Sequence, residues 1–156
     1  SFLDKDSIRL FKKNDAYLLP TLGVHDILVN RIKTVPPQAK PRLKLFLEEW
    51  PGNITKAWKA GVKIALGSDT GVVPHGSAAR EIEWFVKIGM SEAEAIKTAT
   101  INTADHLGMG KRIGKIEAGM SADIIAVSGD PLQDITALKQ MVFVMKEGSI
   151  FKHDQN

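Results

Sequence analysis

The residue in this sequence best placed for chemistry is Asp69, in the stretch Gly-Ser-Asp-Thr-Gly at 67–71. A carboxylate at the carboxyl end of a strand can coordinate a metal ion and take a proton from metal-bound water. The competing interpretation is that Asp69 caps the turn or accepts hydrogen bonds from loop amides, which is the common role of Asp beside Gly. Residue type alone leaves both roles open and favours the structural one.

The loop after Asp69 contains two further candidates, Thr70 and His75. His75 is the better one, because an imidazole can meet a substrate carboxylate or carbonyl, although a loop histidine bonded only to backbone is at least as common. The four histidines lie at positions 25, 75, 106 and 153. They form no His-x-His or His-x-x-x-His pair, so the sequence contains no paired histidine ligands for a metal.

Three other catalytic or binding motifs fail on inspection. At 114–121 the glycines of a phosphate-binding loop are present, but Met120 stands where that loop requires Lys. At 67–71 the pattern resembles a nucleophile elbow with Asp as nucleophile, yet an elbow leads straight into a helix and Pro74 intervenes. The Gly-x-Gly at 108–110 has no third glycine at the dinucleotide-binding spacing.

The composition is that of a folded globular protein. Of 156 residues, 44% are hydrophobic and 25% are charged, and the net charge of +3 comes from interleaved signs, which argues against disorder and against a nucleic-acid partner. The lack of cysteine excludes disulfides, thiolate metal sites and a cysteine nucleophile. No apolar run suits a membrane span, and the first residues lack the pattern of a signal peptide. We therefore expect no membrane partner, and the compartment stays undecided.

Hydrophobic periodicity and breaker residues divide the first half of the chain. We expect a helix over 4–14, a strand over 16–21, a helix around 26–33 and a strand over 62–68. Asp4 is the candidate N-cap of the first helix. Between 41 and 58 the apolar spacing predicts two helical stretches, separated by Pro51-Gly52 because proline breaks a helix interior.

The second half begins with helices and ends with strands. We expect helices over 78–88 and from 91 to about 107, then strands over 123–127, 141–146 and 149–151. Ser91 and Glu94 have the spacing of a capping box, which marks the start of the second of these helices.

Two strands that are each followed by helices predict βα units of a parallel sheet, so the fold class is α/β, with a small β-rich appendage behind it. In the strand at 62–68, the bulky Val62, Ile64 and Leu66 share one parity. If that set faces covering helices, Asp69 faces the other side at the carboxyl end. In a (β/α)8 barrel that side is the interior, and that end is where the chemistry takes place.

Four stretches taken together resemble the metal-dependent amidohydrolase superfamily, in the branch of imidazolonepropionases and Xaa-Pro dipeptidases (prolidase-like enzymes). They are VKIALGSDTG at 62–71, PHG at 74–76, the helix at 91–108 and GKIEAGMSADIIAVSGDPL at 114–132. The resemblance runs from Ser1 to about Lys152. The glycine and Ala-Asp pattern around Asp123 is specific in combination with the strand that leads to Asp69.

The resemblance implies a fold and a site. Segments 16–21 and 62–68 would be strands seven and eight of a TIM-like (β/α)8 barrel, with barrel units over 1–110 and part of a composite β-sandwich over 111–156. Asp69 would contact the metal, zinc or another divalent cation in one or two copies, and accept a proton from the hydrolytic water. The reaction would cleave an amide or peptide C–N bond in a small substrate such as a dipeptide, with Thr70 and His75 as candidates for substrate contact.

The resemblance also implies ligands that this sequence lacks: a His-x-His pair on strand one, a carboxylated Lys or a Glu on strand four, and histidines on strands five and six. We therefore expect a C-terminal fragment that needs the N-terminal part of the barrel as its partner. We expect this polypeptide alone neither to hydrolyse substrate nor to hold zinc tightly. Two strands cannot close a barrel, and their open edges favour a homo-oligomer.

Two alternatives remain open beside this interpretation. The first is a non-catalytic binding or assembly module whose strand edges pair with another copy or another chain. The second is an α/β hydrolase with Asp69 as nucleophile, which would need no metal and which the loop at 72–76 disfavours.

Overall fold

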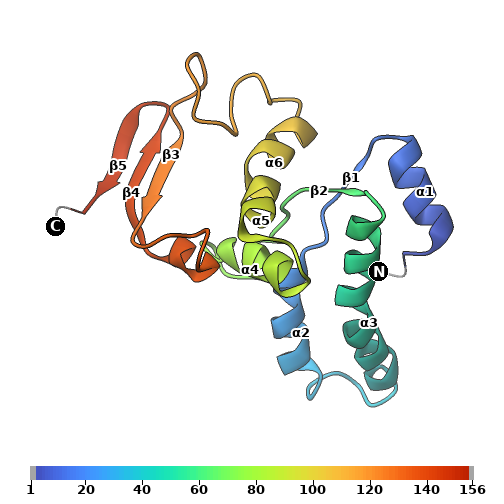
Figure 1. Cartoon of the computed structure of the whole chain (residues 1–156). Helices are drawn as coiled ribbons and strands as arrows, with labels where there is room; N and C mark the ends of the chain where they lie inside the picture. The colour runs from blue at the N-terminus through green and yellow to red at the C-terminus, as the bar shows by residue number, and fades with distance from the viewer. Residues whose placement is uncertain (1–2, 155–156) are drawn as a thin grey trace.

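The computed structural model describes residues 3–154 and alternates short strands with helices before it ends in a small sheet (Figure 1). The elements are α1 (Lys5–Lys13), β1 (Tyr17–Leu18), η1 (Leu22–Val24), α2 (His25–Arg31), α3 (Lys40–Lys59), β2 (Lys63–Ile64), α4 (Ala79–Lys87), α5 (Glu92–Ala99), α6 (Ile101–His106), β3 (Ile124–Val127), η2 (Ile135–Lys139), β4 (Met141–Lys146) and β5 (Ser149–His153). Asp4 accepts a hydrogen bond from Ser7 N at 2.7 Å and caps α1 as predicted.

The strands β1 and β2 pair in parallel, with Tyr17 opposite Lys63 and Leu18 opposite Ile64. The α/β class is therefore correct, but the strands are much shorter than the expected 16–21 and 62–68. The backbone leaves the ladder because Leu66 N donates to Thr98 O, at 3.0 Å, instead of to a neighbouring strand.

The segment at 41–58 is one helix, α3, and not the two stretches that Pro51 led us to expect. Proline removes the N–H that would bond to the carbonyl four residues earlier, which belongs to Leu47. That carbonyl has another partner, because the Nε2 atom of His25 lies 3.0 Å from Leu47 O. A side chain from α2 thus replaces the lost bond, and the helix continues through the proline.

The expected helix at 91–107 begins with the predicted Ser91–Glu94 capping box but divides at Thr100 into α5 and α6. At this division Thr98 O accepts hydrogen bonds from Leu66 N and from Thr103 Oγ1, the latter at 2.6 Å. The Nδ2 atom of Asn102 donates to Ile64 O at 2.9 Å. The helix is interrupted where it attaches to β2.

A single apolar core joins these units. Phe85, Leu22 and Ile54 are its largest fully buried apolar side chains, and they come from α4, η1 and α3. The core therefore fixes α4 against the segment that follows β1, which matters for the site below.

The chain ends in an antiparallel sheet of order β3-β4-β5, close to the predicted strands. Glu147 and Gly148 both have positive φ and form the two-residue turn between β4 and β5, as a type I′ hairpin requires. Asp123 Oδ1 accepts from Glu147 N at 2.7 Å and holds this turn.

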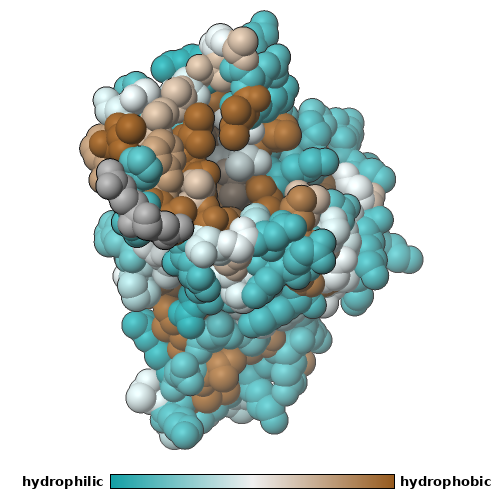
Figure 2. Space-filling model, turned by 60° about the vertical axis from the view of Figure 1, so that its left-hand side comes forward, coloured by the Kyte–Doolittle hydropathy of each residue, from teal (hydrophilic) through white to brown (hydrophobic). Residues whose placement is uncertain are grey.

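Apolar side chains remain exposed on this sheet: Ile125, Met141, Ile150 and Phe151. Figure 2, which brings this side of the molecule forward, shows apolar surface gathered there. Among the described residues, no helix is both long enough and apolar enough to cross a bilayer.

Candidate active site

Asp69 lies five residues beyond β2, in a tight turn, with its side chain exposed. Its φ of 51° is left-handed, a conformation that Asp and Asn adopt more readily than other residues with a Cβ. Its carbonyl accepts hydrogen bonds from Val72 N at 3.0 Å and Val73 N at 3.3 Å. The backbone of Asp69 therefore makes the turn, and within residues 3–154 its carboxylate has no hydrogen bond or ion pair.

The rest of the turn keeps Asp69 in place without engaging its carboxylate. The hydroxyls of Ser68 and Thr70 lie 2.8 Å apart, and Gly71 N donates to Val73 O at 3.1 Å. Val73 is buried in the core and anchors the loop. The result is a fixed backbone that presents a free carboxylate at the carboxyl end of a parallel strand.

Thr70 and His75 both lie on this loop and are exposed. The Thr70 hydroxyl is engaged by Ser68. The His75 ring has no hydrogen-bond partner in the part of the chain that the structure describes, so the backbone-bonded interpretation of His75 is not realised there. Roles for both residues in substrate contact stay predictions.

Asp69 does not belong to a cluster of metal-ligating side chains among the described residues. Residues 3–154 contain no group of three or more His, Asp or Glu side chains that could hold a metal ion. The residues present therefore do not make a metal site by themselves, because zinc needs three or four protein ligands.

Glu81 is a residue of this region that the sequence analysis missed. It lies on α4, is 1% exposed, and accepts a hydrogen bond from Gly23 N to Oε2 at 2.6 Å. Burial raises the pKa of Glu81 to about 7, against the opposing effect of the Gly23 hydrogen bond and of the neighbouring backbone at Leu22 and Thr21. A signal was present, since Glu81 and Phe85 are four residues apart and share the buried face of the helix.

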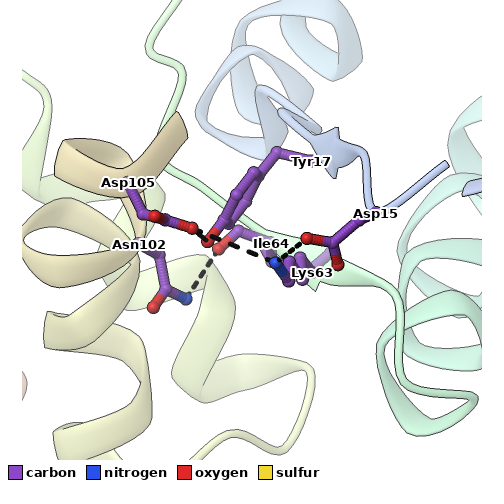
Figure 3. Close-up of polar contacts among 6 residues, drawn as sticks. All are labelled: Asp15, Tyr17, Lys63, Ile64, Asn102 and Asp105. Carbon is purple, nitrogen blue, oxygen red and sulfur yellow. Dashed lines mark hydrogen bonds and ion pairs between the residues drawn. The ribbon is translucent and has the colours of Figure 1, made fainter. Parts of the chain in front are cut away.

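A second polar cluster lies where β1 and β2 begin, at the opposite end of the strands from Asp69 (Figure 3). Tyr17 donates to Asp105 Oδ2 at 2.6 Å, and Lys63 Nζ lies 2.6 Å from Asp15 and 3.9 Å from Asp105. Burial, followed by the bond to Asp105, raises the pKa of Tyr17 to about 12. This cluster ties α6 to both strands, and we assign it a structural role.

The sequence of this chain is similar to those of known proteins. Residues 44–151 match the Amidohydrolase family. Ochratoxinase from Aspergillus niger is 32% identical over 158 residues, which cover 97% of this chain and 32% of that protein. An imidazolonepropionase from Shouchella clausii is 32% identical over 118 residues, or 70% of this chain and 26% of the relative.

The fold of this chain is also similar to solved structures. A crystal structure of a Xaa-Pro dipeptidase with bound methionine in the active site has a TM-score of 0.90 to this chain at 33% identity. The match covers 97% of this chain and 38% of the dipeptidase chain. This chain thus spans less than half of each of these relatives.

Proposed function

Because this chain belongs to the amidohydrolase family, we propose that it supplies the C-terminal part of a metal-dependent hydrolase, including one carboxylate of the active site. The observation that carries the proposal is the Asp69 carboxylate, which is exposed, free of partners within residues 3–154 and held at the carboxyl end of a parallel strand. In parallel α/β folds that end of the strands is where ligands bind.

In this proposal β1 and β2 are strands seven and eight of a (β/α)8 barrel, and β3–β5 are part of a composite β-sandwich. Support comes from the parallel pairing of β1 with β2 and from the 97% of this chain that superposes on the dipeptidase. Each of the two strands has one strand neighbour in the described chain, so the other edges are free to pair with the remaining barrel strands.

The proposed reaction is hydrolysis of an amide or peptide C–N bond in a small substrate such as a dipeptide. A zinc or other divalent ion would activate the water, and Asp69 would contact the ion and accept the proton. The remaining metal ligands must come from outside residues 3–154, which offer no metal-binding cluster. The relatives that support this substrate class are the Xaa-Pro dipeptidase and the imidazolonepropionase.

The second candidate is a non-catalytic assembly module, which the open strand edges and the exposed apolar residues of the β3–β5 sheet favour. Here the strands would pair with a second copy of the chain. Native mass spectrometry of the chain mixed with a segment that carries the six other strands separates the two candidates. A dimer of this chain that persists in the mixture supports assembly, and its replacement by the two-part complex disfavours it.

The activity is tested by assaying Xaa-Pro dipeptide hydrolysis by this chain alone and together with a segment that carries the six other strands. We expect turnover only with both parts and zinc, and its loss on adding a chelator. Hydrolysis that persists in chelator would instead indicate Asp69 as a nucleophile. A properly assembled, zinc-loaded complex that hydrolyses no amide or peptide substrate would overturn the proposal.

A further inference from the structure

The segment that leaves the carboxyl end of β1 is a buried turn with an unusual cap. Thr21 has φ 52° and provides no side-chain cap to η1, whose residues Leu22–Val24 are all buried. The cap comes instead from another part of the chain, because Glu81 Oε2 accepts from Gly23 N at 2.6 Å across 58 residues of sequence. A carboxylate at the amino end of a helical turn satisfies an otherwise free N–H group.

The approach of α4 to this turn is close. A Cβ at Gly23 would lie 3.4 Å from Glu81 Oε2, and 3.7 Å from both Glu81 N and Arg80 Cβ. The backbone of η1 therefore rests directly on the first turn of α4. One turn later on the same helix, the Trp84 ring lies 4.7 Å from the ring of His25, the first residue of α2.

The two segments joined by Glu81 come from neighbouring strands. The turn Thr21–Val24 follows β1, and α4 follows the loop that begins at Asp69 beyond β2. Because β1 and β2 are parallel, their carboxyl ends lie at the same edge of the sheet. The hydrogen bond between Glu81 and Gly23 N thus joins the segment that follows β1 directly to the helix that follows β2.

We propose that Glu81 is a positioning residue whose buried carboxylate fixes the Thr21–Val24 turn against α4, so that the segments following β1 and β2 keep one relative geometry. The bond itself does not depend on the hydrolase function. Its consequence, a fixed placement of the Asp69 loop beside its neighbour, rests on the proposed function.

Two observations support a specific role over simple filling of space. The carboxylate is kept in the core although burial raises its pKa to about 7, which is a free-energy cost that an apolar side chain would avoid. Its Oε1 atom has no hydrogen-bond partner among the described residues, so Gly23 N is the partner that the structure shows for this side chain.

Hydrogen exchange measured by mass spectrometry on the full chain tests the proposal, with peptides that cover 19–25 and 67–77. In Glu81→Ala, we expect exchange in both peptides to rise by about tenfold, since a buried N–H loses its acceptor. Glu81→Gln should restore most of the protection, because its amide oxygen can accept from Gly23 N. Glu83→Gln is the matched control on the same helix, where Glu83 pairs with Lys139 at 2.6 Å.

Ile54→Ala, a buried position on α3, provides a variant that loses core packing but leaves the Glu81–Gly23 hydrogen bond intact. A Glu81→Ala pattern identical to that of Ile54→Ala, or a Glu81→Gln variant as unprotected as Glu81→Ala, would overturn the proposal. Should Glu81→Ala not fold, the Gly23 amide proton shift decides: in the native chain it moves with pH as the Glu81 carboxyl titrates, and this movement is absent in Glu81→Gln. A native Gly23 shift that does not titrate would also overturn it. None of these readouts needs catalysis, so they succeed or fail separately from the hydrolase assay.

Discussion

The Nε2 atom of His25 lies 3.0 Å from Leu47 O, the carbonyl that Pro51 leaves without its helical partner. This contact explains how α3 runs unbroken through a proline, and it ties α2 to α3 beside the core.

A double-mutant cycle tests this explanation. In Pro51→Ala the new N–H bonds to Leu47 O, so the carbonyl no longer needs His25. We expect His25→Ala to lower the free energy of unfolding by about 1 kcal/mol less in the Pro51→Ala background than in the native one. The packing of His25 against Trp84 is lost in both backgrounds and cancels. The free energies are measured by urea denaturation. If His25→Ala lowered the free energy of unfolding equally in both backgrounds, the explanation would be contradicted.

Glu81 predicts a particular pH dependence of stability. Its pKa rises from 4.5 to about 7 on folding, so between these values the folded state binds more protons than the unfolded state, and stability falls as the pH rises. Glu81→Gln lacks this titration. We expect the stability of Glu81→Gln relative to the native chain to increase from pH 4.5 to pH 7 by about 3 kcal/mol. A difference that is constant across this range, measured by urea denaturation, would refute a raised pKa.

We expect alanine to lower stability by different amounts at two glycines of the motif at 114–132. A Cβ at Gly114 would lie 2.7 Å from Ala104 Cβ and 2.9 Å from Thr100 O, whereas a Cβ at Gly119 meets no atom within 4 Å among the described residues. Both have positive φ, of 92° and 88°. We expect Gly119→Ala to cost about 1 kcal/mol of stability from the backbone alone and Gly114→Ala to cost about 3 kcal/mol. Thermal unfolding of the two variants makes the comparison, and equal losses would show that contact at Gly114 is unimportant.

Local signals in the sequence were enough to predict several elements. Asp4 and the Ser91–Glu94 pair act through residues three positions away, so their caps follow from spacing alone. The exposed turn of Asp69 after a strand was also predictable, because glycines flank it.

The features that sequence reasoning missed depend on partners distant in the chain. The continuity of α3 depends on His25, which lies 22 residues before Leu47. The role of Glu81 depends on Gly23, 58 residues away. The division of α5 from α6 depends on Leu66, whose N–H binds Thr98 O. Periodicity within one helix contains no information on these tertiary hydrogen bonds.

We expect the isolated chain to bind zinc weakly. Asp69 would supply one ligand, and residues 3–154 contain no cluster to complete a site. In isothermal titration we expect no stoichiometric zinc binding by this chain at micromolar concentration. Tight binding of one equivalent would show that the chain has a metal site of its own.

The central claim, that the Asp69 carboxylate takes part in hydrolysis, is tested most directly by Asp69→Asn in the assembled, zinc-loaded enzyme. Asparagine also tolerates the left-handed φ of 51°, so the turn is preserved while the proton acceptor is lost. Asp6→Asn, an exposed carboxylate on α1, is the matched control. We predict that kcat for dipeptide hydrolysis falls by about 10²- to 10⁴-fold in Asp69→Asn and is unchanged in Asp6→Asn. Near-native kcat in Asp69→Asn would contradict the claim.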